Sequence, residues 1–382
     1  MIKSKTASLK TRILAAADWY VNSQVISKQP YWDANHGRFI YNRHIKSGIT
    51  VLGINWTCAR GIMVTLATYE LTGNKKYLEA ARRAGEYIKS LQLVTPWNPR
   101  INGAIAEQMP QSEMSAPRDA VEAADALLFL YRITKDKEYL IRAELWADWF
   151  LKNVKPMGWP VGYFSLYNNN HNKTYYFFEV ANSMFFYHLF LATENRKYVS
   201  QIFPYLVEPF KAKNFREDGA ILTLKFDAHH SGRGKDAGIA QNDDGCGITL
   251  LCDYKLKKDK KTMALCLKYG DYIISQKLPR AIHSAFPSQA IYLIELAKVS
   301  GDSKYSDYVI NNLHYITDLQ IIKHKAPCIQ GAFKGEDEGG KWYYKGSKTL
   351  DFVTNRVTAY SALAMLKLHG KVFGPYYSSL DW

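Results

Sequence analysis

The sequence of 382 residues lacks the features that mark membrane, metal-binding and nucleic-acid-binding proteins. No stretch reaches the roughly 18 consecutive apolar residues that a membrane-spanning helix requires. Its five cysteines show no C-x-x-C pair and no other zinc-ligand spacing, and their odd number leaves at least one thiol unpaired. Neither an Arg-rich arm nor a nucleic-acid recognition motif is present. We therefore expect a globular protein with buried thiols and no cofactor, in the cytoplasm unless a signal peptide has been removed.

The charge is strongly unbalanced, since 50 Lys and Arg face 35 Asp and Glu and give a net charge of +15. The basic residues are spread along the whole chain and accompany 27 Tyr and 9 Trp. Aromatic faces stack on sugar rings, while Lys, Arg and Asn bind carboxylates and hydroxyls. A basic surface that is merely solvated explains the charge without a ligand. The combination nevertheless favours an anionic carbohydrate as the partner over nucleic acid or a membrane.

Internal repetition is the strongest signal in the sequence. A short turn recurs five times, each with Asn or Asp at its third position, where it can cap the following helix. The copies are Thr72-Gly-Asn-Lys-Lys-Tyr77, Thr134-Lys-Asp-Lys-Glu-Tyr139, Thr193-Glu-Asn-Arg-Lys-Tyr198, Lys257-Lys-Asp-Lys-Lys-Thr262 and Ser300-Gly-Asp-Ser-Lys-Tyr305. An apolar helix precedes each turn and an amphipathic helix follows it. The pattern predicts five helical hairpins with apolar inner and amphipathic outer helices.

Two helices remain outside these hairpins, at residues 7–25 and roughly 351–369. The first is amphipathic and the last is apolar, so together they can form a sixth hairpin that closes a ring. An open solenoid would instead need polar caps at both ends. The sequence therefore predicts an all-α fold, an (α/α)6 toroid, in which residues 1–382 form one domain.

A coarser repeat supports this arrangement. Gly103-Ala-Ile, Gly219-Ala-Ile and Gly331-Ala-Phe each begin a long polar connection that runs into the next inner helix. Long loops on a rigid scaffold are where binding and catalytic residues concentrate. We therefore expect these connections to lie on one rim and to border a cleft.

The candidate functional residues lie at the expected N-termini of the inner helices or in the loops that precede them. The candidate catalytic residues are Asp119, Glu179, Asp243 and Asp244. The candidate substrate-binding residues are Trp56, Arg118, Asn182, His229, His230, Arg356, Tyr41 and His44. Carboxylates at helix N-termini also cap helices and complement the helix dipole, so a structural role competes with a catalytic one.

Three pairs among these candidates suggest two different reactions. Asp119 and Glu179 precede consecutive inner helices, which could hold them at the separation that acid/base glycoside cleavage requires. The adjacent Asp243 and Asp244 repel each other, which can raise one pKa and make a proton donor. His229 and His230 would instead suit a lyase, in which a base removes the proton beside a uronate carboxylate.

The segment Asn55-Trp-Thr-Cys-Ala-Arg-Gly-Ile-Met, continued by Tyr69-Glu-Leu-Thr-Gly73, resembles the first inner helix of the unsaturated glucuronyl and rhamnogalacturonyl hydrolases. This resemblance implies an (α/α)6 carbohydrate-active enzyme with essential aspartates at successive inner-helix starts, where Asp119 and Glu179 stand by order. Two features depart from it: the W-x-R-G-[QN]-x-W type of motif is absent, and Glu replaces Asp at 179. The adjacent Asp-Asp before Gly resembles the endo-α-mannanases instead.

Four hypotheses follow from these observations. The first is a glycoside hydrolase acting on acidic, uronate-containing oligo- or polysaccharide through its carboxylates. The alternatives are a uronate polysaccharide lyase that uses His, Tyr and Arg, a sugar epimerase, and a non-catalytic toroid that binds glycans. The oligomeric state is left open by the sequence.

Overall fold

The computed structural model describes residues 2–158, 162–168, 174–175, 177–223, 226–227, 238–240, 243, 245–278, 284–335 and 348–373. Helices dominate, and residue contacts divide the chain into two compact units. Unit 1 comprises Met1–Ile88, Leu278–Ile294 and Ser303–Ser378, and unit 2 is mainly Lys89–Lys277 with Glu295–Asp302. No helix in the described part of the chain is long and apolar enough to cross a membrane. All five cysteines carry free thiols, and four of them are buried.

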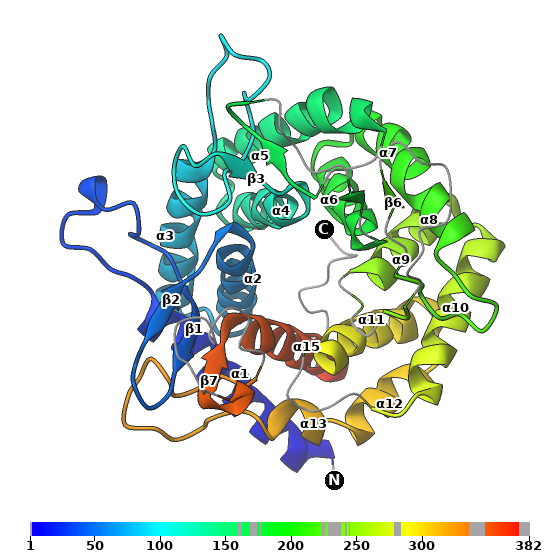
Figure 1. The fold of residues 1–382 in the computed structure, drawn as a ribbon. Helices are drawn as coiled ribbons and strands as arrows, with labels where there is room; N and C mark the ends of the chain where they lie inside the picture. The colour runs from blue at the N-terminus through cyan, green and yellow to red at the C-terminus, as the bar shows by residue number, and fades with distance from the viewer. Residues whose placement is uncertain are drawn as a thin grey trace. The chain divides into compact units, whose positions relative to one another are not determined.

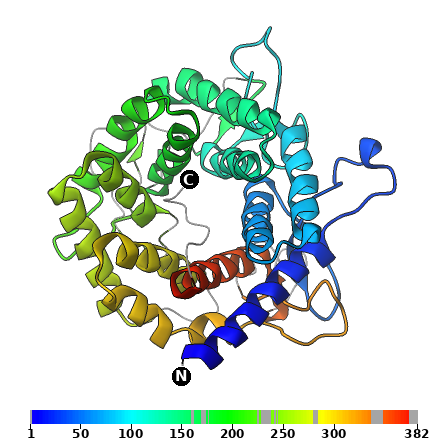
Figure 2. The same cartoon turned by 180° about the vertical axis from the view of Figure 1, so that it is seen from behind.

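Unit 1 joins the two ends of the chain, and Figure 2 shows α1 running beside α2 and α15. Tyr20 on α1 donates a hydrogen bond to Asn355 Oδ1, 3.2 Å away at the start of α15. The predicted pairing of the first and last helices is therefore confirmed. The helices of this unit are α1 (Ile2–Ser23), α2 (Asn55–Thr72), α3 (Lys75–Leu91), α11 (Ala285–Ser300), α12 (Lys304–Asn311), α13 (His314–Thr317) and α15 (Asn355–Phe373), of which α3 and α11 extend past its bounds.

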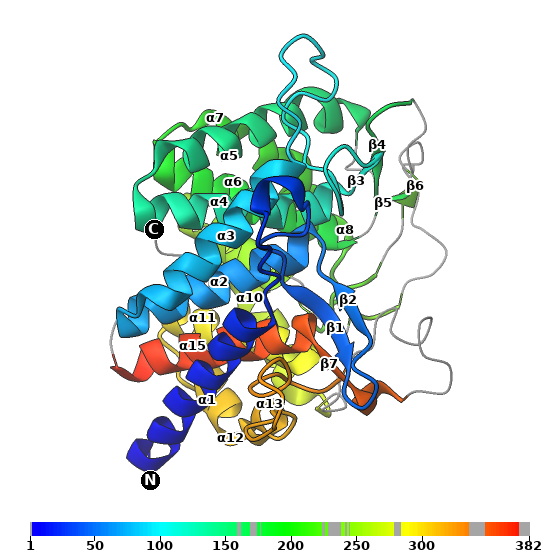
Figure 3. The same cartoon turned by 90° about the vertical axis from the view of Figure 1, so that its left-hand side faces the viewer.

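A small antiparallel sheet in unit 1, ordered β2-β1-β7, stands at the N-terminal end of α15 (Figure 3). Its strands are β1 (Ile40–His44), β2 (Thr50–Leu52) and β7 (Phe352–Thr354). Because β7 runs directly into α15 and β2 lies just before α2, the sheet fixes the starts of both helices.

Unit 2 has two helical layers, in which α4, α6 and α9 lie side by side and the others cover them (Figure 1). Its helices are α4 (Pro117–Thr134), α5 (Lys137–Trp149), α6 (Asn182–Thr193), α7 (Lys197–Ile202), α8 (Glu208–Lys213), α9 (Cys246–Lys257) and α10 (Lys260–Ser275). Two short strand pairs, β3 (Met114–Ser115) with β4 (Phe164–Ser165) and β5 (Thr174–Tyr175) with β6 (Phe226–Asp227), lie in its connections. The helices α4, α6 and α9 are buried on nearly all sides, whereas covering helices such as α5 and α10 have one buried and one exposed face. This is the contrast that the repeats predict.

Each recurring turn has the same backbone conformation. Its second residue is left-handed, with φ between 54° and 77°, at Gly73, Lys135, Glu194, Lys258 and Gly301. In four turns the Asn or Asp at the third position accepts a hydrogen bond from the backbone N–H two residues later, as Asp136 does from Glu138 at 3.0 Å. The turn thus ends one helix and caps the next.

The Gly-Ala-Ile repeats also have a common structure. Gly103, Gly219 and Gly331 adopt positive φ and press against the backbone of α5, α10 and α1 respectively. A Cβ atom at Gly103 would lie 2.3 Å from the carbonyl oxygen of Leu145. Each glycine therefore lets a connection dock directly on a covering helix.

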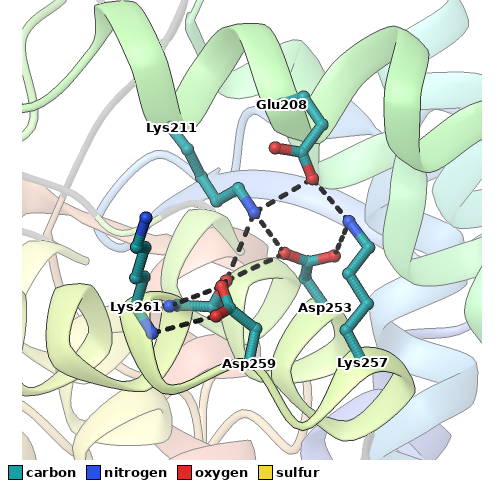
Figure 4. Close-up of polar contacts among 7 residues, drawn as sticks. Glu208, Lys211, Asp253, Lys257, Asp259 and Lys261 are labelled. Atoms are coloured by element: carbon teal, nitrogen blue, oxygen red, sulfur yellow. Dashed lines mark hydrogen bonds and ion pairs between the residues drawn. The ribbon is translucent and has the colours of Figure 1, made fainter.

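A buried ion-pair network joins α8, α9 and α10 within unit 2 (Figure 4). Asp253 on α9 is fully buried, and its two carboxylate oxygens lie 2.7 Å from Lys211 and 2.7 Å from Lys257. Glu208 contacts both lysines from α8. A buried carboxylate held by two cations ties the first layer to its cover.

Candidate active site

Glu179 and Asp243 are the two fully buried carboxylates among the described candidates, each with 1% of its surface exposed. Glu179 lies in the short 3₁₀ segment Phe177–Ala181, which runs directly into α6 at Asn182. The Asn182 side chain donates a hydrogen bond from Nδ2 to Oε2 of Glu179 at 3.0 Å. The first residue of the helix therefore holds the acid that precedes it.

The surroundings of Glu179 favour its neutral form. Burial raises its pKa to about 8, and the negative charge of Asp119 acts in the same direction. The positive charge of Arg118 and the bond from Asn182 oppose that rise without cancelling it. A carboxyl with a pKa of about 8 is protonated at neutral pH and can donate a proton.

Arg118 and Asp119 come from the first turn of α4, which begins at Pro117 because proline suits the first helical position. Nη1 of Arg118 lies 2.6 Å from Oε1 of Glu122, one turn further along the helix. Asp119 is half-buried in the first turn of the helix, where a carboxylate complements the helix dipole. The structure thus brings Asp119, Glu179, Arg118 and Asn182 together.

Tyr205 joins this group, and the sequence did not single it out. It lies in the π-helical segment Phe203–Val207, between α7 and α8, and its hydroxyl is buried. Burial and the charge of Glu179 raise the pKa of Tyr205, so its phenol stays protonated. The available signal was Pro204 and Pro209, which interrupt an otherwise helical pattern.

Asp243 has a different surrounding, since it is buried just before α9 and serves that helix. Its two carboxylate oxygens accept hydrogen bonds from the backbone N–H groups of Gly245 at 3.1 Å and Gly247 at 2.8 Å. This geometry is that of a helix cap. Asp244, His229 and His230 lie outside the described residues.

Unit 1 contains a second group of the predicted residues, around Trp56 at the start of α2. The Tyr41 ring meets the Trp56 ring edge-on, with centroids 5.9 Å apart. The Arg60 guanidinium lies 4.0 Å from the centroid of Tyr360 and 5.7 Å from that of Trp56. Trp56 and Tyr41 remain half-exposed, so the group presents aromatic surface beside a cation.

Two further candidates belong to the same unit. Arg356 is the second residue of α15 and is half-buried. His44 is buried, packs against Phe352 with ring centroids 5.1 Å apart, and has its Nδ1 atom 2.8 Å from Ser47 Oγ. These contacts fit a packing role for His44 in the sheet.

Comparison with solved structures identifies proteins with the same chain path. An unsaturated glucuronyl hydrolase specific for heparin matches with a TM-score of 0.69 at 15% identity, over 96% of this chain and 97% of that one. The α-1,6-mannanase of Salegentibacter sp. HEL1_6 matches with 0.66 at 13%, over 95% and 99%. A sugar epimerase from a ruminal bacterium matches with 0.68 at 14%, over 94% and 98%.

The chain has the all-α (α/α)6 fold. These matches confirm the predicted fold class and the resemblance to (α/α)6 carbohydrate-active enzymes. No family model matches the sequence, and no curated protein matches it either. In the described part of the chain, no group of His, Cys, Asp and Glu could hold a metal ion.

Proposed function

We propose that this protein is a glycoside hydrolase that cleaves uronate-containing oligosaccharides, with Glu179 as the proton donor and Asp119 as the second carboxylate. The observation that carries the proposal is the environment of Glu179, whose buried carboxyl has a pKa of about 8 beside the charge of Asp119. Glycoside cleavage needs two carboxyl groups with opposite protonation at the working pH. This pair offers that asymmetry.

The roles follow from the two environments. Glu179 is neutral and protonates the glycosidic oxygen as the bond to the leaving sugar breaks. Asp119, half-buried at the start of α4, takes the second role on the opposite side of the sugar, as base for water or as nucleophile. Asp243 holds the start of α9 through two backbone N–H groups, so we assign it a structural role.

The acidity of the substrate is supported by the charges of the protein. Arg118 places a buried guanidinium beside Glu179, and the chain as a whole carries a net charge of +15. Two proteins with this fold are unsaturated glucuronyl hydrolases by name, one of them responsible for the degradation of glycosaminoglycan.

The test is turnover of a panel of uronate-containing oligosaccharides by isosteric variants. Asp119→Asn and Glu179→Gln should each lower kcat by about 10²- to 10⁴-fold, the usual contribution of a catalytic acid or base. Asp148→Asn removes an exposed carboxylate on α5 that pairs with Lys197, and it should keep wild-type activity. Full activity in both active-site variants would refute the proposal.

A change in absorbance separates the hydrolase from the remaining hypotheses. A uronate lyase creates an unsaturated uronate chromophore, whereas an unsaturated-glycuronyl hydrolase destroys it. An epimerase changes neither, and a non-catalytic binder yields no product. Appearance of the chromophore would therefore favour the lyase, and its loss favours the hydrolase.

A further inference from the structure

A buried histidine–carboxylate pair lies in unit 2, six residues further along α4 and α6 than Asp119 and Asn182. Nδ1 of His188 on α6 lies 2.7 Å from Oδ1 of Asp125 on α4. The two side chains are 2% and 8% exposed, respectively. Phe129, one turn after Asp125, sets its ring 5.3 Å from the imidazole. One face of α4 therefore holds the imidazole by a polar contact and a ring contact at once.

We infer that Asp125 and His188 are positioning residues. Their contact fixes α4 against α6 and thereby sets the position of Asp119 relative to Glu179. The inference rests on the proposed function, because it concerns the same two carboxylates. In this proposal, His188 and Asp125 act through the helices that carry them.

The register of the two helices supports this. Asp125 follows Asp119 by six residues on α4, and His188 follows Asn182 by six residues on α6. Six residues correspond to about 9 Å along a helix axis. Because Asn182 holds Glu179, each helix carries its active-site group and its half of the pair at the same interval. If α6 moved along α4, Glu179 would therefore shift relative to Asp119 by the same distance as His188 relative to Asp125.

The groups around the pair make another chemical role a poor fit. Cys252 on α9 faces it, and burial together with the charges of Glu295 and Asp125 raises the pKa of that thiol, so it is a weak nucleophile. Glu295, at the far end of α11, is itself buried. The described residues here form no group suited to a metal ion. Directional contact between two helices is the role that remains.

A polar pair fixes position more sharply than an apolar contact of the same size, because it has one short, directional geometry. Buried polar pairs can be replaced by apolar side chains with little loss of stability, but then lose that specificity in some systems. A displacement of about 1 Å at reacting groups can lower a rate about 10²-fold. Stability and turnover should therefore respond differently to changes in the pair.

The experiment compares two double variants of the full-length protein. Asp125→Leu with His188→Phe removes the polar contact but keeps an apolar core, and it should lower kcat about tenfold or more while KM changes less than about twofold. Asp125→Asn with His188→Gln keeps an uncharged hydrogen bond and should recover most of the lost kcat. Equal, wild-type kcat in both variants would overturn the inference.

A second variant keeps the test decisive if the apolar double variant does not fold. Phe129→Leu removes the ring contact alone and should lower kcat in the same direction by a smaller factor. Phe150→Leu makes the same change in a fully buried ring that packs on Trp146 and Phe186, away from His188. It should lose stability without losing kcat. An equal loss of kcat in both leucine variants would show that the effect comes from destabilisation and not from the contact between α4 and His188.

The ionisation of Glu179 provides a readout that needs no substrate. In protein with ¹³C-labelled Glu, the carboxyl resonance lost in Glu179→Gln belongs to Glu179. Its titration should shift in the apolar double variant, because Asp119 and Arg118 change their distance from it, and should return in the amide variant. A wild-type protein inactive on every glycan would refute the proposed function. An unshifted Glu179 titration in the apolar double variant would refute the positioning role of Asp125 and His188.

Discussion

Glu179 makes a quantitative prediction about how stability depends on pH. Its pKa is about 8 in the folded protein and 4.5 in the absence of burial. Between these values the folded state holds a proton that the unfolded state has released, so stability falls as pH rises. Each pH unit costs about 1.4 kcal/mol, and the interval of 3.5 units gives an upper limit of about 5 kcal/mol. The contribution is fully present below pH 4.5 and fully lost above pH 8.

Glu179→Gln removes the titrating group and keeps its shape, so the variant should not lose stability over this range through residue 179. In urea unfolding at intervals from pH 4.5 to 9, the stability of the wild type should fall more steeply with pH than that of the variant up to about pH 8, and in parallel with it above that pH. The variant should gain on the wild type by up to about 5 kcal/mol by pH 8 and hold a constant difference above it. The matched control is Glu217→Gln, because Glu217 is exposed and keeps its hydration on folding. A free-energy difference that is the same at pH 5 and pH 8 would refute the assigned environment of Glu179.

Three further predictions concern the scaffold and the charge. Asp253→Asn should destabilise the protein by about 3 kcal/mol in urea unfolding, because it leaves Lys211 and Lys257 around a buried neutral group. Asp218→Asn, in the exposed pair with Arg216, should change the stability much less, and equal losses would contradict the burial of the network. Gly103→Ala should lower the free energy of unfolding by about 3 kcal/mol, because its Cβ would meet the Leu145 carbonyl. Gly73→Ala, with open space around it, should lower it by about 1 kcal/mol. A thermal melt that ranks the two variants in the opposite order would contradict the docking geometry. Binding of a uronate oligosaccharide, followed by calorimetry, should weaken several-fold between 0.05 and about 0.5 M salt, because salt screens exposed charges over less than about 10 Å; affinity independent of salt would contradict an anionic ligand.

The recurring turns explain why the fold could be predicted from the sequence. Thr72-Gly73-Asn74 and its four relatives encode a left-handed residue, and in four of these turns the third residue also caps the following helix. The glycine of each Gly-Ala-Ile repeat is fixed by close backbone contact with a covering helix. Local signals of this kind survive in a single sequence because they depend on neighbouring residues.

The chemistry of individual carboxylates could be predicted less well, because it depends on what distant segments bring near. Asp119, Asp243 and Glu179 look alike in the sequence, as acids beside an apolar helix. Only the fold distinguishes Glu179, buried among Arg118, Asn182 and Tyr205, from Asp243, whose oxygens accept bonds from its own helix. Tyr205 was missed because a π-helical segment turns it inward from a covering helix, and no periodicity predicts that turn.

The division of the chain into units has a consequence for its synthesis. Residues 89–277 supply nearly all of unit 2 in one continuous stretch, so this unit can fold while later residues are still being translated. Unit 1 has to wait, because α1 and α2 pack against α15, which ends at Phe373. Until α15 leaves the ribosome, α1 lacks a helix that it packs against and Tyr20 lacks its hydrogen-bond partner Asn355. The nascent chain therefore exposes apolar side chains of α1 through most of translation. We expect chaperones to bind this segment, and we expect chains that stall late in synthesis to aggregate through it.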